Sequence, residues 1–203
     1  MSRLFLVRHG ETELQSSERL WGITDVKLGA LGLKQAERLR DRLVEEKFDT
    51  IYSSNLKRAL KTAEIIASRH KLPVITCPEL REFNYGEIEG LNQEQIKELY
   101  PEFHKSMMQR SSNLRFPGGE SVYQLNNRVS KFLPKLKKHT PKETILIVAH
   151  FGLLRVLLCR LLDIGIKRRW QIHLDLASLS ILETNQKGGT LTLLNDVSHL
   201  AQV

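Results

Sequence analysis

The sequence predicts an α/β fold in three layers (α/β/α), with a mostly parallel central sheet and an inserted lid of helix and loop. Short apolar runs alternate with amphipathic helical patterns in the first part of the chain, which is typical of a parallel sheet covered by helices. A later run, residues 144–149, is apolar and rich in β-branched residues, as expected of a central strand buried on both faces. Residues from about 78 to 120 interrupt the alternation with charged residues, glycines and a short helical pattern near residues 95–100, and we interpret them as the lid.

Two helices and three strands are expected before the lid. The first helix has apolar positions at near 3.6-residue spacing over residues 33–43. The second follows the N-cap candidate Ser54 and must end before Pro73. The strands are expected at residues 4–7, 50–53 and 74–77.

After the lid, Ser121 and Gln124 have the spacing of a capping box. The apolar stripe that follows them predicts a helix that Pro134 should kink or end. A buried helix is expected at residues 153–162, behind the strand at 144–149. The chain should end in a hairpin or two edge strands, at residues 178–182 and 190–194, joined across Gly188 and Gly189.

The composition indicates one compact globular domain, residues 1–203, with 41% hydrophobic and 27% charged residues. Cys77 and Cys159 stand apart, without histidines at ligand spacing, which favours reduced, buried thiols over a disulfide or a metal site. No apolar run approaches the roughly 18 residues of a membrane span, and the N-terminal run is too short for a signal peptide. A cytoplasmic monomer or homodimer without membrane contact is therefore expected.

The net charge of +8 suits an anionic partner, namely a nucleic acid, an anionic lipid or a phosphorylated small molecule. The densest basic stretch, residues 131–142, follows an amphipathic pattern, which favours a solvated helix face over a binding patch. Phe132 falls on the apolar face of that pattern, so the basic residues have no interleaved aromatic on which bases would stack. A small molecule is thus favoured over nucleic acid.

Basic side chains follow three of the predicted strands at their carboxyl ends. Arg8 and His9 follow the first strand, Arg58 the second, and His150 the strand at 144–149. Because ligands of open α/β sheets bind at this edge, we expect the four side chains to converge. Two guanidinium groups beside two imidazoles form an anion trap, since the guanidinium fork matches the oxygens of phosphate and keeps its charge.

Four sequence blocks resemble, in the same order, the histidine phosphatase superfamily, also called the phosphoglycerate mutase-like family: LVRHGETE, SSNLKRALKTAE, LREFNYGEIEG and VAHFGLLR. With their spacing they cover nearly the whole chain. The resemblance implies that Arg58 is the second phosphate-binding arginine, Glu82 the general acid and His150 the second histidine.

The resemblance also implies contacts to the substrate or its phosphate from Gln15, Gly22 and Phe151. Gln15 stands where relatives usually carry asparagine, and Gly29 replaces a usual hydroxyl residue. Thr12, Ile23 and Thr24 lie in the same matched segments and are expected close to the site.

In the chemistry these residues imply, neutral His9 attacks phosphorus in line through one ring nitrogen while the other nitrogen keeps its proton, and a phosphohistidine forms. Arg8, Arg58 and His150 surround the equatorial oxygens, where the charge spreads in the transition state. Glu82 protonates the leaving oxygen and later activates water. No metal ion or cofactor is then needed.

Each of these residues also has a purely structural interpretation. Taken alone, an Arg-His pair after a strand is more often an exposed turn, and Arg58 resembles a helix-surface arginine. In the structural interpretation Glu82 is a solvated charge, like the other carboxylates of its stretch. His150 is a core histidine whose hydrogen bonds are satisfied within the protein. The four blocks together favour the catalytic interpretation.

The resemblance favours a phosphatase over a mutase. Mutases of the family have a longer insertion and tail that shield the phosphohistidine from water, whereas this chain is short between Glu82 and Gly119. The stretch FPGGES resembles α-ribazole phosphatases and broad-specificity phosphatases of the family. α-Ribazole 5'-phosphate, an intermediate of cobalamin biosynthesis, is therefore the named candidate substrate. A phosphoglycerate mutase and a phosphatase for sugar phosphates or fructose 2,6-bisphosphate are the alternatives. An apolar wall for the substrate, or else the packing of the lid on the body, is expected from five residues: Tyr85, Phe103, Met107, Met108 and Phe116.

Overall fold

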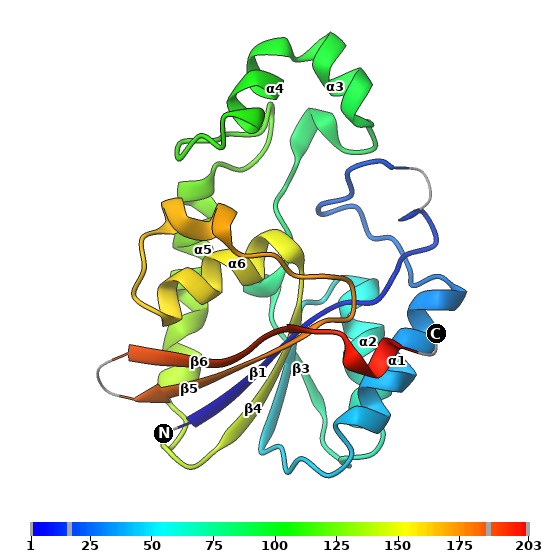
Figure 1. Cartoon of the computed structure of the whole chain (residues 1–203), viewed down its shortest axis with the longest axis vertical. Coiled ribbons are helices and arrows are strands. Elements are labelled where there is room, and N and C mark those ends of the chain that lie inside the picture. The colour runs from blue at the N-terminus through cyan, green and yellow to red at the C-terminus, as the bar shows by residue number, and fades with distance from the viewer. Residues whose placement is uncertain (1, 16–17, 186–187, 202–203) are drawn as a thin grey trace.

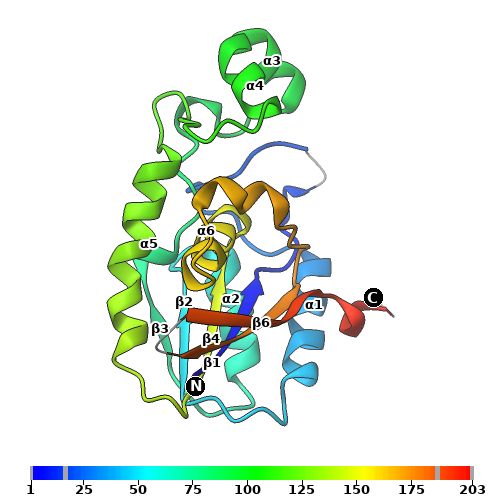
Figure 2. The ribbon, with the colours of Figure 1, turned by 60° about the vertical axis from the view of Figure 1, so that its left-hand side comes forward.

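The structure is a computed structural model that describes residues 2–15, 18–185 and 188–201. Within these ranges it contains one sheet of six strands in the order β3-β2-β4-β1-β5-β6. Helices cover both faces of the sheet (Figures 1 and 2). The predicted three-layer α/β fold is therefore confirmed.

The bounds of the elements are as follows. The strands are β1 (Ser2–Arg8), β2 (Thr50–Ser53), β3 (Val74–Thr76), β4 (Thr144–Ala149), β5 (Leu179–Asn185) and β6 (Gly188–Asp196). The α-helices are α1 (Ala30–Arg42), α2 (Lys57–Ala67), α3 (Gln93–Leu99), α4 (Pro101–Met108), α5 (Val122–Lys137) and α6 (Phe151–Leu161). Short 3-10 helices are η2 (Pro78–Leu80), η3 (Gly86–Ile88), η4 (Ile166–Gln171) and η5 (Ser198–Leu200).

The sheet is mostly parallel, as predicted. β4 pairs in parallel with β1 and with β2, and β2 pairs in parallel with β3. β5 runs antiparallel to β1, and β6 antiparallel to β5, so the C-terminal hairpin extends one edge of the sheet. Parallel neighbours end at the same edge, so the chain leaves β1, β2 and β4 side by side.

Two apolar clusters hold the layers together, one on each face of the sheet. Leu4 and Leu6 of β1 join the residues of α5 and α6, whereas Phe5 and Val7 join those of α1 and α2. β4 contributes to both clusters by the same alternation. Strands buried on both faces read as continuous apolar runs, which explains why residues 144–149 were identified to the residue.

Three local predictions were wrong. Ser54 does not cap α2; its backbone N–H donates to the Val148 carbonyl, which keeps the chain extended and moves the N-cap to Leu56. Of the two effects predicted for Pro134, a kink or an end of the helix, the end is wrong: α5 continues to Lys137, with apolar residues on both sides of the proline packed into the core. Gly188 and Gly189 do not join the strands but lie inside β6, opposite Asn185 and Thr184; residues 186 and 187 lie outside the described ranges.

The first helix also begins earlier than its apolar pattern indicated. Its N-cap is Gly29, and Leu33 is 38% exposed, because the face turned toward the sheet carries Ala36 and Leu39. The capping box of Ser121 and Gln124 is present as predicted, with both reciprocal hydrogen bonds.

The segment interpreted as a lid leaves the sheet after β3. It carries α3 and α4, which lie at the top of Figure 1, beyond the carboxyl ends of the strands. α4 was not predicted, because its sequence after Pro101 is mostly polar and only the pattern near residues 95–100 stood out. Among the described helices, none is long and apolar enough to cross a membrane.

Candidate active site

The carboxyl ends of β1 and β4 bring two histidines together. The backbone N–H of His9 donates to the Ala149 carbonyl at 3.1 Å, so the residue after β1 lies beside the end of β4. His150 follows Ala149 directly, and the two imidazole centroids are 5.0 Å apart. The convergence predicted from the strand ends is therefore present for this pair.

The tautomer of His9 follows from one contact. Nδ1 lies 2.8 Å from the carbonyl oxygen of Gly10, which only accepts hydrogen bonds, so Nδ1 carries the proton and Nε2 the lone pair. Burial lowers the pKa of His9 well below its ordinary value, and the nearby charges of Arg58 and Arg8 lower it further. Neutral His9 thus presents an unprotonated ring nitrogen.

Arg58 is the second residue of α2 and is only 1% exposed, which excludes the helix-surface interpretation. Its guanidinium donates to the carbonyls of Gly22 and Thr24. Arg8 donates to the Leu174 carbonyl at 2.7 Å, and its Nε is buried without a partner. Within the described ranges no carboxylate forms a direct ion pair with either arginine.

His150 is fully buried, and neither of its ring nitrogens has a hydrogen-bond partner among the described residues. Burial and the charge of Arg58 hold its pKa well below the ordinary value. An orphaned buried imidazole is costly for a folded protein and needs an explanation. A ligand oxygen between the two arginines would supply the missing acceptor or donor.

Glu82 lies buried against the first turn of α6. One carboxylate oxygen accepts from the backbone N–H groups of Phe83 and Leu153, and the other from that of Gly152 at 2.8 Å. The first N–H groups of a helix have no intrahelical partner, and Glu82 accepts from two of those of α6. A Cβ at Gly152 would come within 2.6 Å of this carboxylate, so the glycine makes room for it. Glu82 is therefore not a solvated charge.

The comparisons with known proteins agree with this geometry. The family model of the histidine phosphatase superfamily (branch 1) matches residues 4–197. The chain belongs to the histidine phosphatase superfamily. Phosphoserine phosphatase 1 of Hydrogenobacter thermophilus is 34% identical over 100% of this chain and 96% of its own. The adenosylcobalamin/α-ribazole phosphatase of Escherichia coli is 31% identical over 95% of each chain. A crystal structure described as a putative α-ribazole-5'-P phosphatase from E. coli matches with a TM-score of 0.89, 31% identity and 96% coverage of both chains. Together with the family match, these relatives identify the chain as a phosphatase of this superfamily.

The other residues predicted from the sequence differ in how they contact the active site of this histidine phosphatase. Gly22 reaches the site through its carbonyl, which binds Arg58. Phe151 borders it, with the Arg8 guanidinium carbon 4.9 Å from the ring centroid. Gln15 is exposed, and no hydrogen bond joins its side chain to His9 or Arg58 in the described part of the chain.

Sequence reasoning missed Glu89, which orders the loop that holds Arg58. Its carboxylate accepts from the backbone N–H groups of Gly22, Ile23 and Thr24, and from the Thr24 hydroxyl at 2.6 Å. The interpretation as a solvated carboxylate concealed this role. The signal available in the sequence was only its place in the LREFNYGEIEG block.

A pocket of about 570 Å³ is lined by Phe151 and Gly152, which follow His150 in the chain, and we call it the leaving-group pocket. Phe83 and Gly152, whose N–H groups hold Glu82, both line it. Four of the five predicted wall residues are among its lining: Tyr85, Met107, Met108 and Phe116. The fifth, Phe103, packs behind Phe116 with ring centroids 5.2 Å apart, so for this residue the packing interpretation holds.

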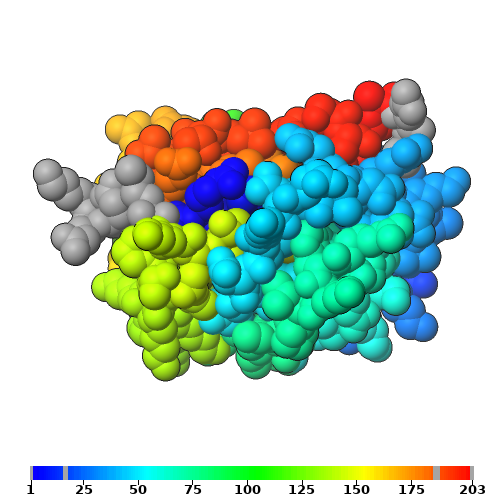
Figure 3. Space-filling model, turned by 90° about the horizontal axis from the view of Figure 1, so that it is seen from below, coloured from blue at the N-terminus to red at the C-terminus, as the bar shows by residue number. Residues whose placement is uncertain are grey.

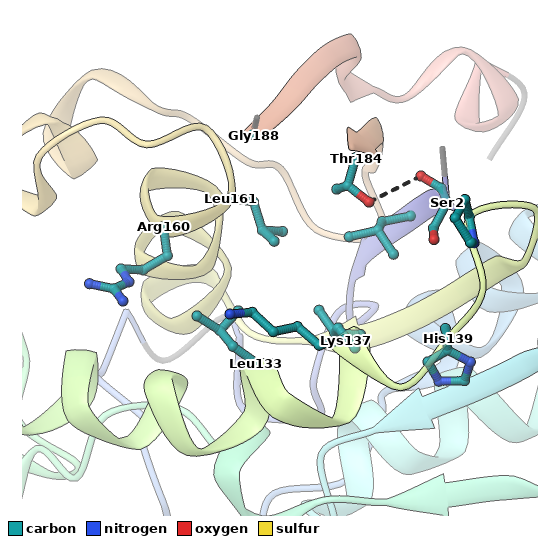
Figure 4. Close-up of a pocket in the computed structure, with 11 residues that line it drawn as sticks. Ser2, Leu133, Lys137, His139, Arg160, Leu161, Thr184 and Gly188 are labelled. Atoms are coloured by element: carbon teal, nitrogen blue, oxygen red, sulfur yellow. Dashed lines mark hydrogen bonds between the residues drawn. The ribbon is translucent and has the colours of Figure 1, made fainter. Parts of the chain in front are cut away.

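A second cavity of similar volume lies at the opposite end of the sheet, near the amino end of β1. Figure 3 shows this face from below, with the start of β1 between the segment after α5 and the C-terminal hairpin. Figure 4 shows Leu133 and Lys137 of α5 facing Leu161 of α6 across it. It is separated from His9 by the length of β1, so it is not part of the active site.

Cys77 and Cys159 are both buried free thiols, as predicted. No group of three or more His, Cys, Asp or Glu side chains in the described ranges is arranged to hold a metal ion.

Proposed function

We propose that the protein is a metal-independent phosphomonoesterase that hydrolyses a small phosphorylated metabolite through a phosphohistidine at His9. The observation that supports this most strongly is the orientation of His9: Nδ1–H donates to the Gly10 carbonyl, and the ring lies near the positive charges of the buried Arg58 and the half-buried Arg8. The positive charge that a metal would otherwise supply comes from these arginines.

In the first step Nε2 of His9 forms a bond to phosphorus as the bond to the leaving oxygen breaks. Arg8 and Arg58 stabilise the charge that spreads over the equatorial oxygens. His150, which has no partner in the described part of the protein, hydrogen-bonds to one of these oxygens.

Glu82 donates its proton to the leaving oxygen and becomes a carboxylate. In the second step this carboxylate takes a proton from the water that attacks the phosphohistidine. Inorganic phosphate leaves, His9 is neutral again, and Glu82 again carries its proton. Its hydrogen bonds to Phe83 and Gly152, two residues that line the leaving-group pocket, support this role, although Glu82 itself lines a neighbouring cavity.

Hydrolysis is supported by the named phosphatases among the relatives, although one relative is named a probable phosphoglycerate mutase. Two kinds of substrate are supported by names: α-ribazole 5'-phosphate, which the FPGGES stretch also favours, and phosphoserine. Sugar phosphates and fructose 2,6-bisphosphate are the broader alternative. The proposal includes a single domain with residues 78–120 as its lid, acting as a cytoplasmic monomer or homodimer.

The test is phosphate release from a chromogenic phosphomonoester in excess EDTA. The wild-type protein should release phosphate, and His9→Ala should not, whereas His104→Ala on α4 is the matched control and should retain activity. Release by His9→Ala would remove the proposed nucleophile. Interconversion of 2- and 3-phosphoglycerate faster than phosphate release would indicate a mutase.

A further inference from the structure

The leaving-group pocket contains a buried positive charge that the proposed chemistry does not use. Arg155, in α6, is 7% exposed and lines this pocket. Its Nε donates to the Arg169 carbonyl at 2.5 Å. In the described part of the chain, its two Nη groups form neither a hydrogen bond nor an ion pair. A planar fork of N–H donors therefore faces the pocket unused.

The surroundings of Arg155 do not neutralise it. Its guanidinium carbon lies 4.6 Å from the Phe151 ring centroid and 5.0 Å from that of Trp170, contacts that hold the group in place without removing its charge. Burial lowers the pKa of Arg155 to about 10, and the charge of Arg169 adds to the shift. Even so, it is charged at neutral pH. A buried cation without a counterion is costly, so an anion is the expected partner.

The rest of the pocket has the same sign. Its lining includes two further arginines and a histidine: Arg110, Arg169 and His173. No aspartate or glutamate is among the described residues that line it. The Arg169 guanidinium is engaged by the carbonyls of Ile166 and Ser111. Among the described residues that line the pocket, only Arg155 is a buried arginine with free Nη groups, so the pocket offers one site for one charge.

The site also lies at the right place for the leaving group. Phe151 and Arg155 are four residues apart on α6, and so they share a face of the helix. The guanidinium carbons of Arg8, in the phosphate cage, and of Arg155 both lie within 5 Å of the Phe151 ring centroid. Arg155 is therefore within reach of a group that extends along the Phe151 ring from a phosphate at Arg8.

We propose that Arg155 binds a carboxylate on the leaving alcohol, so that the substrate is the phosphate ester of a small hydroxy acid or hydroxyamino acid. The inference rests on the proposed phosphatase function. A carboxylate carries one charge and matches a single guanidinium fork bidentately. A second phosphate group carries more charge than one guanidinium balances; the proposed site of the reacting phosphate has two arginines, Arg8 and Arg58. A neutral alcohol, such as the nucleoside released from α-ribazole 5'-phosphate, would leave Arg155 unpaired.

The experiment compares pairs of esters that differ in the carboxylate. The pairs are phosphoserine with phosphoethanolamine, and 3-phosphoglycerate with glycerol 3-phosphate. For the wild-type protein we expect kcat/KM to be about 100-fold higher for the carboxylate member of at least one pair, because the carboxylate pairs with the buried charge of Arg155. Arg155→Met, which keeps the packing against Phe151 and Trp170, should reduce this ratio to a few-fold, and Arg155→Lys should restore part of it.

The control is Arg160→Met, an exposed arginine at the other end of α6, which should leave the ratio unchanged. Thermal unfolding of each variant shows whether it is folded, and the ratio of two esters on one variant is insensitive to its overall activity. An equal loss on both members of a pair would assign Arg155 a structural role and overturn the proposal. A wild-type preference for α-ribazole 5'-phosphate, or an Arg155-dependent preference for fructose 2,6-bisphosphate, would also overturn it.

Failure of the phosphatase function is distinguishable from these results. If no ester of the panel and no chromogenic ester releases phosphate, the proposed function itself is wrong. If esters are hydrolysed but the carboxylate has no effect on kcat/KM, the function stands and the assignment of Arg155 is wrong.

Discussion

Glu89→Gln tests whether the loop at residues 22–24 is held in place for catalysis by one carboxylate. In the wild-type protein one oxygen of Glu89 accepts from the backbone N–H groups of Ile23 and Tyr85, and the other from Gly22 and Thr24. The substitution turns one oxygen into an NH2 group that faces donors. At least two charge-assisted hydrogen bonds are then lost.

The expected magnitude follows from those contacts. Each hydrogen bond to a charged group contributes about 1.5–3 kcal/mol, and water recovers part of the loss because the side chain is only half-buried. We therefore expect a net loss of up to about 3 kcal/mol, which corresponds to a fall of up to about 150-fold if all of it affects the transition state. The carbonyls of Gly22 and Thr24 bind Arg58, so disorder of this loop releases the guanidinium from its position.

The assay is kcat/KM with a chromogenic phosphomonoester, together with urea unfolding of each variant. Glu87→Gln is the matched control, because Glu87 is exposed and its carboxylate accepts only from the Tyr100 hydroxyl in the described part of the chain. We expect Glu89→Gln to lose at least tenfold in kcat/KM and Glu87→Gln to lose less than twofold. Equal activity of the two variants would refute the role of Glu89 in positioning Arg58.

Three further predictions follow from local contacts. Gly22→Ala should lower kcat/KM and destabilise the fold by about 1–3 kcal/mol, because its Cβ would meet a backbone oxygen at 2.1 Å; Gly165→Ala, with open space around it, is the neutral control. His9 and His150 are neutral when folded but protonate near pH 6.5 when unfolded, so the free energy of unfolding should fall as the pH drops below about 6.5, until their folded pKa values are reached. Urea titrations across pH measure this, and a flat profile would contradict the lowered pKa values. Pro134→Ala restores a helical hydrogen bond in α5 and should raise stability by about 1–3 kcal/mol in the same assay, whereas an unchanged midpoint would show that the helix is already relaxed around the proline.

The fold and the cationic part of the site were predictable because both depend on short-range patterns. Apolar runs define β1, β2 and β4, and the rule that ligands bind at the carboxyl ends of parallel strands then brings His9 and His150 together. Arg58 needed no more than its place after β2. Its burial, however, depends on a loop that sequence periodicity does not describe.

The contacts that sequence did not predict are long-range and polar. Glu89 lies 67 residues from Gly22, and nothing in the pattern around either residue indicates that they meet. Arg155 sits in a helix that is apolar on nearly every side, and its sequence gives no sign that its charge stays unpaired. In both cases the decisive fact is which groups lack or share a partner, which only the folded arrangement shows.

Rapid quench with an ester labelled in its phosphoryl group tests most directly whether His9 is transiently phosphorylated. We expect an acid-labile, base-stable label that peptide mapping places on His9, with no label on His9→Ala. Label on His150, on a serine or on a cysteine, or turnover without any labelled protein, would contradict it.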